Sequence, residues 1–277
     1  TLGAIKDASI IEHVGRRIGE HCKRLGVHIN FAPVVDINTN PKNPIIGNRS
    51  FGEDTDNVTQ KSIAFIKGMQ SAGILANAKH FPGHGDTDAD SHKTLPTINF
   101  SKNRIASIEL YPYKRLMNQG LSSVMVAHLN VPSLEPQNGL PSSLSKIIVT
   151  DILKKDLGFK GLIFTDALNM KGAANFDKPG EIDLAAFLAG NDVLLISENI
   201  PKAHQVIVKA YQDKLISKER LAHSVKKILY GKYKVGLHQY TPVDQRNLIE
   251  DLNTPIDAAL YEKAIENALT ILKNKDQ

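Results

Sequence analysis

Residues 79–96 hold the densest group of side chains that could do chemistry in this chain. They read Lys-His-Phe-Pro-Gly-His-Gly-Asp-Thr-Asp-Ala-Asp-Ser-His-Lys-Thr-Leu-Pro and follow an apolar stretch. Pro82, Gly83 and Gly85 prevent a regular helix, so we expect a loop that leaves the end of a strand. Ionisable groups concentrated on such a loop suggest a solvated turn, a metal site or a catalytic site.

The two simpler interpretations are open at this point. Lys79 could end a strand in solvent, with the aspartates acting only as turn formers, because loops are normally polar. A zinc site is the second, since Asp90 is accompanied by three histidines of the kind that bind this metal. These histidines are His80, His84 and His92. The zinc site is the weaker of the two, because Pro-Gly between the first two histidines removes the helical face on which such a pair binds zinc.

Amphipathic helical segments alternate with short apolar strands along the chain. The expected strands are 29–36, 74–81, 123–128, 161–166 and 192–197. The expected helices are 8–25, 54–73, 102–119 with a bend at Pro112, 144–157, 181–190, 201–214, 218–231 and 255–272. Strands that are apolar on both faces and separated by helices predict a parallel sheet.

Polar groups at the carboxyl ends of these strands favour a barrel over a doubly wound sheet. They are Asp36, Lys79, His80, His128 and Asp166. In a barrel these ends converge on one mouth, whereas a doubly wound sheet predicts a glycine-rich phosphate turn that is absent here. We therefore predict an α/β fold, a TIM-type (β/α)8 barrel. Since about five β/α units can be counted, the first strands are expected to be missing from this chain.

Four segments carry a family resemblance. Residues 79–85 (Lys-His-Phe-Pro-Gly-His-Gly) followed by Asp90-Ser91-His92 resemble the signature of β-N-acetylglucosaminidases in glycoside hydrolase family 3. Phe-Ala-Pro-Val-Val-Asp at 31–36, Ile-Gly-Asn-Arg-Ser-Phe at 46–51 and Gly-Leu-Ile-Phe-Thr-Asp-Ala-Leu-Asn-Met at 161–170 match in the same order. The resemblance covers roughly residues 1–235. It implies removal of terminal β-linked N-acetylglucosamine from cell-wall muropeptides or chitin-type oligosaccharides, with retention of configuration and without a cofactor or metal.

The resemblance also assigns roles. It makes Asp166 the nucleophile, His92 the general acid/base and Asp90 the partner of that histidine. It implies sugar contacts by Arg49, Lys79 and His80. Many relatives have a second acid directly after the nucleophile, where this chain has Ala167, so Asp166 is the only carboxylate of its strand tip. Without the resemblance, a helix N-cap would be the better interpretation of this aspartate.

Histidine suits the acid/base role because its ordinary pKa of about 6.5 lets it give and regain a proton near neutrality. Asp90 can orient one ring nitrogen and stabilise the imidazolium. A neutral histidine also repels an incoming anion less than a glutamate does, so phosphorolysis is a further hypothesis. The other hypotheses are a β-glucosidase, a non-catalytic sugar-binding barrel and a metal-dependent hydrolase.

Composition and charge exclude several classes of protein. Lys and Arg number 34 against 29 Asp and Glu, but the charges are scattered without a basic tract, which argues against nucleic acid. No apolar run approaches the ~20 residues that span a bilayer. The single cysteine, Cys22, excludes a disulfide framework and is predicted to be a buried thiol. The expected partner is a carbohydrate substrate.

We expect an N-terminally incomplete catalytic barrel over residues 1–250 and a helix with a linker over 251–277. Residues 264–274 resemble the junction at which longer family members enter a second α/β domain. A second domain or chain that completes the barrel is therefore expected, because open sheet edges would otherwise leave the chain unstable or inactive. The chain opens Thr1-Leu2-Gly3 without a secretory pattern, and bacterial cytoplasm and periplasm both stay open.

Overall fold

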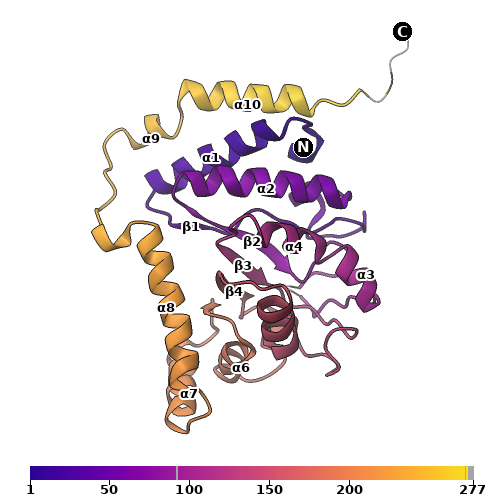
Figure 1. Cartoon of the computed structure of the whole chain (residues 1–277), viewed down its shortest axis with the longest axis vertical. Helices are drawn as coiled ribbons and strands as arrows, with labels where there is room; N and C mark the ends of the chain where they lie inside the picture. Colours follow the sequence, from indigo (N-terminus) through magenta and orange to yellow (C-terminus); the bar gives the residue numbers. More distant parts are fainter. Residues whose placement is uncertain (92, 272, 274–277) are drawn as a thin grey trace.

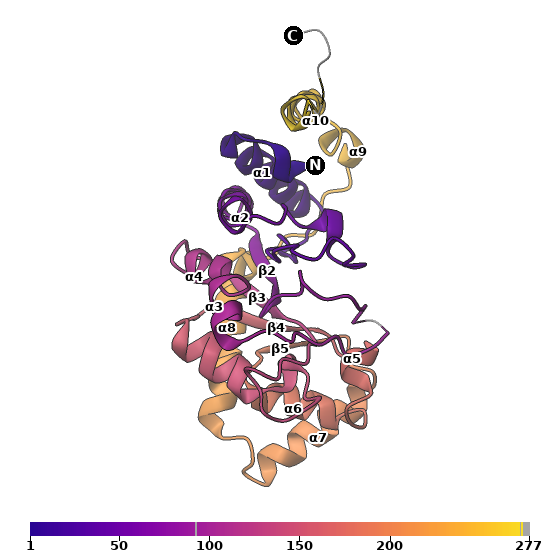
Figure 2. The same cartoon turned by 90° about the vertical axis from the view of Figure 1, so that its right-hand side faces the viewer.

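The computed structural model describes residues 1–91, 93–271 and 273, and its centre is a parallel sheet. The five strands lie side by side in chain order: β1 (Ile29–Asn30), β2 (Leu75–Phe81), β3 (Ser123–Val126), β4 (Leu162–Ala167) and β5 (Val193–Leu195). The sheet curls into half of a barrel, which Figure 2 shows edge-on between two groups of helices. The α/β class and the five parallel strands are confirmed.

Helices cover the sheet in the alternation that the sequence predicts (Figure 1). They are α1 (Ala8–Arg24), α2 (Thr55–Ser71), α3 (Lys102–Ser107), α4 (Tyr111–Met117), a π-helix (Ile147–Asp156), α5 (Lys171–Ala174), α6 (Glu181–Ala189), α7 (Ile200–Gln212), α8 (Lys218–Lys234), α9 (Leu248–Asp251) and α10 (Pro255–Ala268). In Figure 1, α1, α2 and α10 form stacked layers at one end of the molecule.

Several boundaries differ from expectation. The segment 102–119 is two helices, and Pro112 lies in the first turn of α4, where its missing N–H leaves no helical bond unmade. The strand expected over 29–36 pairs regularly only in β1, although Val34 bridges to Lys79 further on. Pro33 interrupts the ladder because it has no N–H to donate. The C-terminal helix ends at Ala268, and the short α5 was not expected.

Glycines bring α1 and α2 into backbone contact. Each helix begins at an aspartate N-cap, Asp7 for α1 and Asp54 for α2. A Cβ at Gly15 would lie 2.3 Å from the Phe65 carbonyl oxygen, and one at Gly68 would lie 1.9 Å from that of Glu12. The two helices can therefore pack this closely only because neither position has a side chain.

A salt bridge between Arg17 and Asp257 links the C-terminal helix α10 to α1. The contact is bidentate: Arg17 Nε lies 2.7 Å from Asp257 Oδ1, and Arg17 Nη2 lies 2.8 Å from Oδ2. Asp257 also accepts hydrogen bonds from Thr254 at the start of α10. The sequence predicted a helix with a linker over 251–277, and that division stays a prediction; residues 255–268 are helical, as expected for the helix, and pack on α1.

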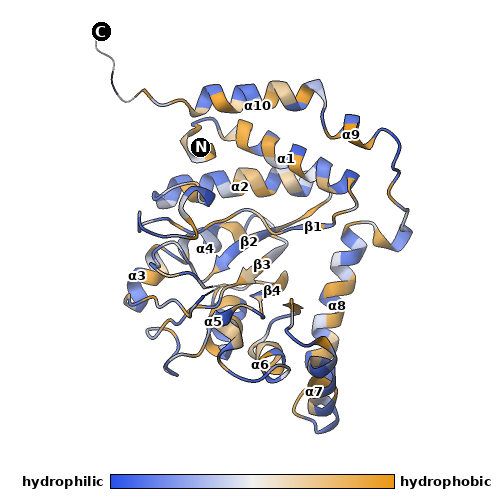
Figure 3. Ribbon diagram, turned by 180° about the vertical axis from the view of Figure 1, so that it is seen from behind, coloured by the Kyte–Doolittle hydropathy of each residue, from blue (hydrophilic) through white to orange (hydrophobic). Residues whose placement is uncertain are grey.

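Apolar side chains remain exposed on α8 and α10, two helices in which Figure 3 marks hydrophobic residues in orange. They include Leu229, Tyr230 and Tyr233 on α8, and Ile256 and Tyr261 on α10, each more than half exposed. Exposed apolar surface of this kind is typical of a contact area. No helix in the described residues is long and apolar enough to cross a membrane.

Cys22 lies on the face of α1 that packs against the main core. Its thiol is half-buried rather than fully buried, and burial raises its pKa above the ordinary value. Because the thiolate is the reactive form, this environment makes Cys22 a packing residue, in line with the sequence-based expectation.

Replacing Gly68 with alanine tests the contact between α1 and α2. We expect Gly68→Ala to lower the free energy of unfolding by about 1–3 kcal/mol, because the new Cβ overpacks a backbone contact. Gly231→Ala is the matched helical control: the neighbours of its Cβ would be the flexible side-chain ends of Leu162, at 3.0 Å, and Leu75, at 3.5 Å. Urea denaturation followed by circular dichroism measures both, and equal stabilities for the two variants would contradict the proposed contact.

Candidate active site

A buried carboxylate, Asp36, organises the carboxyl end of β2. It is 1% exposed and accepts hydrogen bonds from His80 Nδ1 at 2.7 Å and from the backbone N–H of His84 at 2.7 Å. The N–H of His80 also points at it, 3.2 Å away. Burial raises the pKa of Asp36, but His80 and His84 outweigh burial and hold it below its ordinary value. Asp36 is therefore a charged group that orients its neighbours rather than one that faces a substrate.

Lys79 and Arg49, both predicted to bind sugar, line one cavity of about 390 Å³. Phe31 and Asn48 also border it. Lys79 is partly buried, and burial together with Arg49 lowers its pKa, whereas Asp166 and Asp36 act to raise it. In the sheet, the strand of Lys79, β2, lies between β1, which precedes Asp36, and β4, which carries Asp166.

Asp166, the predicted nucleophile, is the penultimate residue of β4. Burial raises its pKa, but His80, His128, the Ala167 N–H and Lys79 lower it further, so the carboxylate stays ionised. Oδ1 accepts a hydrogen bond from that N–H at 2.9 Å. The N-cap interpretation is wrong: the next helix, α5, begins at Lys171 with Met170 as its N-cap.

His128 follows β3 and supports the β4 tip from within. Its Nε2 lies 3.0 Å from the Ala167 carbonyl oxygen and its Nδ1 lies 2.7 Å from Ser143 Oγ. A carbonyl only accepts, so Nε2 carries the proton and Nδ1 accepts from the serine. Burial lowers the pKa of His128, which keeps the ring neutral. No feature of the sequence pattern pointed to Ser143 as its partner.

The loop that follows β2 is anchored at both ends. Near its start, Asn43 donates to the His84 carbonyl at 2.8 Å, and a Cβ at Gly85 would lie only 1.8 Å from the Ile37 carbonyl oxygen. Near its end, Ile98 and Asn130 are joined by a backbone hydrogen bond of 2.9 Å. The loop is therefore held against the strand ends at both of these points.

The middle of this loop lies beside the β4 tip. The carbonyl of Ser91 accepts a hydrogen bond of 3.1 Å from the N–H of Gly172, in α5. The carbonyl of Asp90 accepts from the N–H groups of Lys93 and Thr94, which forms a tight turn. The predicted acid/base residue, His92, lies outside the described residues. The described part of the Asp90-Ser91-His92 segment is thus close in space to the strand that carries the predicted nucleophile.

The zinc alternative finds no support in the described histidines. His80 uses Nδ1 on Asp36, and both ring nitrogens of His84 are bonded, to Thr87 and Ser91. Across residues 1–91, 93–271 and 273, no group of three or more His, Cys, Asp or Glu side chains is arranged to hold a metal ion. The rings of His80 and His84 are instead oriented by hydrogen bonds to other side chains of the protein.

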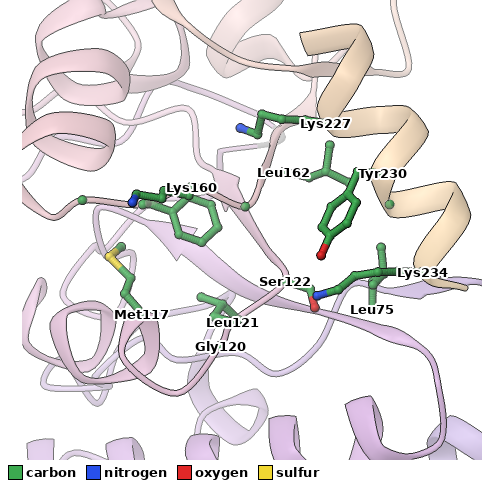
Figure 4. Close-up of a pocket in the computed structure, with 14 residues that line it drawn as sticks. Leu75, Met117, Gly120, Leu121, Ser122, Lys160, Leu162, Lys227, Tyr230 and Lys234 are labelled. Carbon is green, nitrogen blue, oxygen red and sulfur yellow. The ribbon is translucent and has the colours of Figure 1, made fainter. Parts of the chain in front are cut away.

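A separate pocket of about 320 Å³ lies at the other end of the strands (Figure 4). Leu75 and Leu162, the first residues of β2 and β4, line it, together with Lys227, Tyr230 and Lys234 of α8. Asp166 lies four residues further along β4 than Leu162, which is about 13 Å at ~3.3 Å per residue. This pocket does not belong to the candidate active site.

Acidic, basic and imidazole side chains gathered at the carboxyl ends of curled parallel strands are typical of α/β barrel enzymes. Comparison with known proteins identifies the family. The profile of the Glycosyl hydrolase family 3 N terminal domain matches residues 1–230. The chain belongs to glycoside hydrolase family 3.

Relatives with known names agree with this assignment. Beta-hexosaminidase A of Pseudoalteromonas piscicida is 37% identical over 193 residues, which is 66% of this chain and 32% of that protein. The structure of a family 3 beta-N-acetylglucosaminidase from Paenibacillus has a TM-score of 0.94 at 35% identity, covering 100% of this chain and 53% of the other. The beta-glucoside phosphorylase BglX has a TM-score of 0.88 at 27% identity, covering 96% and 49%. The chain spans about a third to a half of the length of these proteins.

The role of Asp36 predicts a pH-dependent loss of stability. Because the folded pKa lies below the ordinary value of about 3.9, its stabilising effect is complete above that pH and is lost as the pH falls through the folded pKa. We expect Asp36→Asn to lower the free energy of unfolding at pH 7 by about 2–4 kcal/mol. The difference from wild type should narrow below about pH 4.

Urea titrations between pH 7 and pH 3 measure this effect. Asp88→Asn, an exposed position on the same loop, is the control and should change stability little at any pH. A difference between wild type and Asp36→Asn that stays constant down to pH 3 would contradict a charged Asp36.

Proposed function

We propose that this chain forms the catalytic part of a retaining β-N-acetylhexosaminidase. Its substrates would be cell-wall muropeptides or chitin-type oligosaccharides, from which it removes terminal β-linked N-acetylglucosamine. The observation that carries the proposal is an ionised Asp166 at the tip of β4, whose pKa Lys79 helps to lower, with the Asp90-Ser91 turn held against α5, the helix that follows this strand. The names of the Pseudoalteromonas and Paenibacillus relatives favour the N-acetylglucosamine substrate.

In the proposed reaction Asp166 attacks the anomeric carbon as the glycosidic bond breaks, and His92 protonates the departing oxygen. A covalent glycosyl-enzyme forms and the leaving group departs as an alcohol. His92 then removes a proton from water, which attacks the same carbon and releases Asp166 as a carboxylate. Asp90 stabilises the imidazolium that gives up its proton in the first step and forms again in the second. The lowered pKa of Asp166 supports the nucleophile role, because the carboxylate is ionised at neutral pH.

The proposed sugar contacts follow from how three side chains are held. Asp36 occupies Nδ1 of His80, which leaves Nε2 on the opposite side of the ring to face a hydroxyl group. Arg49 is exposed and donates to the Ile45 carbonyl through Nη1, so its remaining N–H groups can reach a ligand. Lys79 supplies a charged donor in a partly desolvated position, where its hydrogen bonds are stronger than in water.

We further propose that the curled sheet is part of a TIM-type (β/α)8 barrel and contacts another segment or domain. Two observations support this. The edge strands β1 and β5 each pair on one side only within the described sheet, and unpaired edges need cover. The exposed apolar side chains of α8 and α10 offer a surface for such a contact.

Phosphorolysis is the second candidate, favoured by the likeness to a beta-glucoside phosphorylase. In that reaction phosphate would replace water as the acceptor, and the product would be a sugar 1-phosphate. Incubation in phosphate buffer with analysis of the released sugar separates the two, because hydrolysis gives only free sugar.

Turnover of aryl β-N-acetylglucosaminide and aryl β-glucoside by the full-length protein tests the main proposal. We expect the first to be cleaved faster, with retention of configuration when followed by NMR. Asp166→Asn should lower kcat by at least ~10³-fold, because it removes the nucleophile from a site that still binds sugar. His92→Ala should lower it by about 10²–10⁴-fold. Unchanged turnover by Asp166→Asn would rule out the mechanism.

A further inference from the structure

Ser91 is held by hydrogen bonds on two sides, from the loop that follows β2 and from α5, which follows β4. It is 2% exposed. Its Oγ lies 3.3 Å from His84 Nε2, and its carbonyl oxygen lies 3.1 Å from the backbone nitrogen of Gly172. One residue between Asp90 and His92 therefore connects the start of the loop after β2 with α5, the helix that follows β4.

The hydrogen bond between the Ser91 side chain and His84 has a defined direction. Burial lowers the pKa of His84, so its ring is neutral and carries one proton. Thr87 Oγ donates to the His84 carbonyl and accepts from Nδ1 at 2.6 Å, which puts the ring proton on Nδ1. Nε2 is then an acceptor, and the Ser91 hydroxyl donates to it. Since the His84 N–H donates to Asp36, this chain of bonds ends at the buried carboxylate.

The backbone hydrogen bond between Ser91 and residue 172 requires a glycine at position 172. A Cβ at Gly172 would lie 2.9 Å from the Ser91 carbonyl oxygen, 3.0 Å from that of Thr94 and 3.2 Å from His128 Cβ. These neighbours enclose the position on three sides, and two of them are backbone atoms that cannot rotate away. The loop can approach α5 this closely only because residue 172 has no side chain.

We propose that Ser91 is a positioning residue for the acid–base step of the reaction proposed above, on which this inference rests. Consecutive Cα atoms are about 3.8 Å apart, so a fixed Ser91 limits where Asp90 and the next residue can lie relative to Asp166. General acid–base catalysis is sensitive to this distance, and a misplacement of about 1 Å can lower a rate ~10²-fold. Ser91 acts on the proton donor and not on the sugar.

Ser91→Ala tests the hydrogen bond between the Ser91 side chain and His84, because it removes the hydroxyl group and leaves the backbone hydrogen bond to Gly172. The full-length variant is assayed on N-acetylglucosaminides with a nitrophenyl and a methyl leaving group. Departure of nitrophenolate needs little protonation, whereas methanol departs only with an acid. We expect kcat/KM to fall about 10–100-fold more for the methyl glycoside. For the nitrophenyl glycoside kcat and KM should fall together, because the glycosyl-enzyme accumulates when its hydrolysis lacks a well-placed base.

Azide provides a second readout. It attacks the glycosyl-enzyme without a general base, so it should restore part of the nitrophenyl turnover of Ser91→Ala and yield glycosyl azide. Ser62→Ala removes a serine hydroxyl that is equally buried, in α2, and should affect neither the leaving-group ratio nor the azide response. Equal losses for both glycosides without azide rescue would overturn the positioning role, because a purely structural defect acts on both alike.

Hydrogen exchange separates this inference from the proposed function. Backbone amides of residues 86–97 should exchange faster in Ser91→Ala and in Gly172→Ala than in wild type, whether or not the protein is active. Unchanged exchange in both variants would overturn the positioning role even where wild-type hydrolysis is observed. Absence of wild-type turnover on either glycoside would instead overturn the proposed function, and the positioning role with it.

Discussion

The rest of the site depends on one buried charge. Asp36 is removed from water almost completely, and a carboxylate in that position is stable only when hydrogen-bond donors surround it. It finds them in His80 and in the backbone of His84, which fixes the last residues of β2 and the first of the following loop. Because the buried carboxylate must keep these hydrogen bonds, it fixes the position of the groups that donate them. Residues that would otherwise be a polar strand end are held in one orientation.

A second constraint acts at the tip of β4, where it is steric as well as polar. His128 holds the Ala167 carbonyl from inside the sheet, and Gly172 lets the β2 loop approach to backbone contact. Asp166 directly precedes Ala167 and accepts a hydrogen bond from its N–H. Its surroundings supply positive charge from Lys79 and hydrogen bonding from its own strand, so burial does not neutralise it. Strand pairing brings the two tips to the same edge, and the loop then joins them.

The strands and their polar tips could be predicted from the sequence because both are local features. Apolar runs mark the strands, and Asp36, His128 and Asp166 stand where those runs end. Their partners could not be predicted, because each contact joins distant positions: His128 with Ser143, and Ser91 with Gly172. Helix ends were predicted less accurately. A periodic pattern runs through 102–119, and the sequence indicated only a bend at Pro112, whereas the structure has a full break between α3 and α4 with Leu110 and Tyr113 buried in the core beside it.

Lys79 shows why the site needs both kinds of constraint. A cation next to a carboxylate nucleophile stabilises the ionised form, but it also lowers the nucleophilicity of that carboxylate if the two pair directly. Burial and the nearby Arg49 lower the pKa of Lys79, whereas the charges of Asp166 and Asp36 raise it. In the proposed reaction, a sugar hydroxyl group bound by Lys79 would share the field of the ammonium with Asp166, so the strand tips must hold both groups in place.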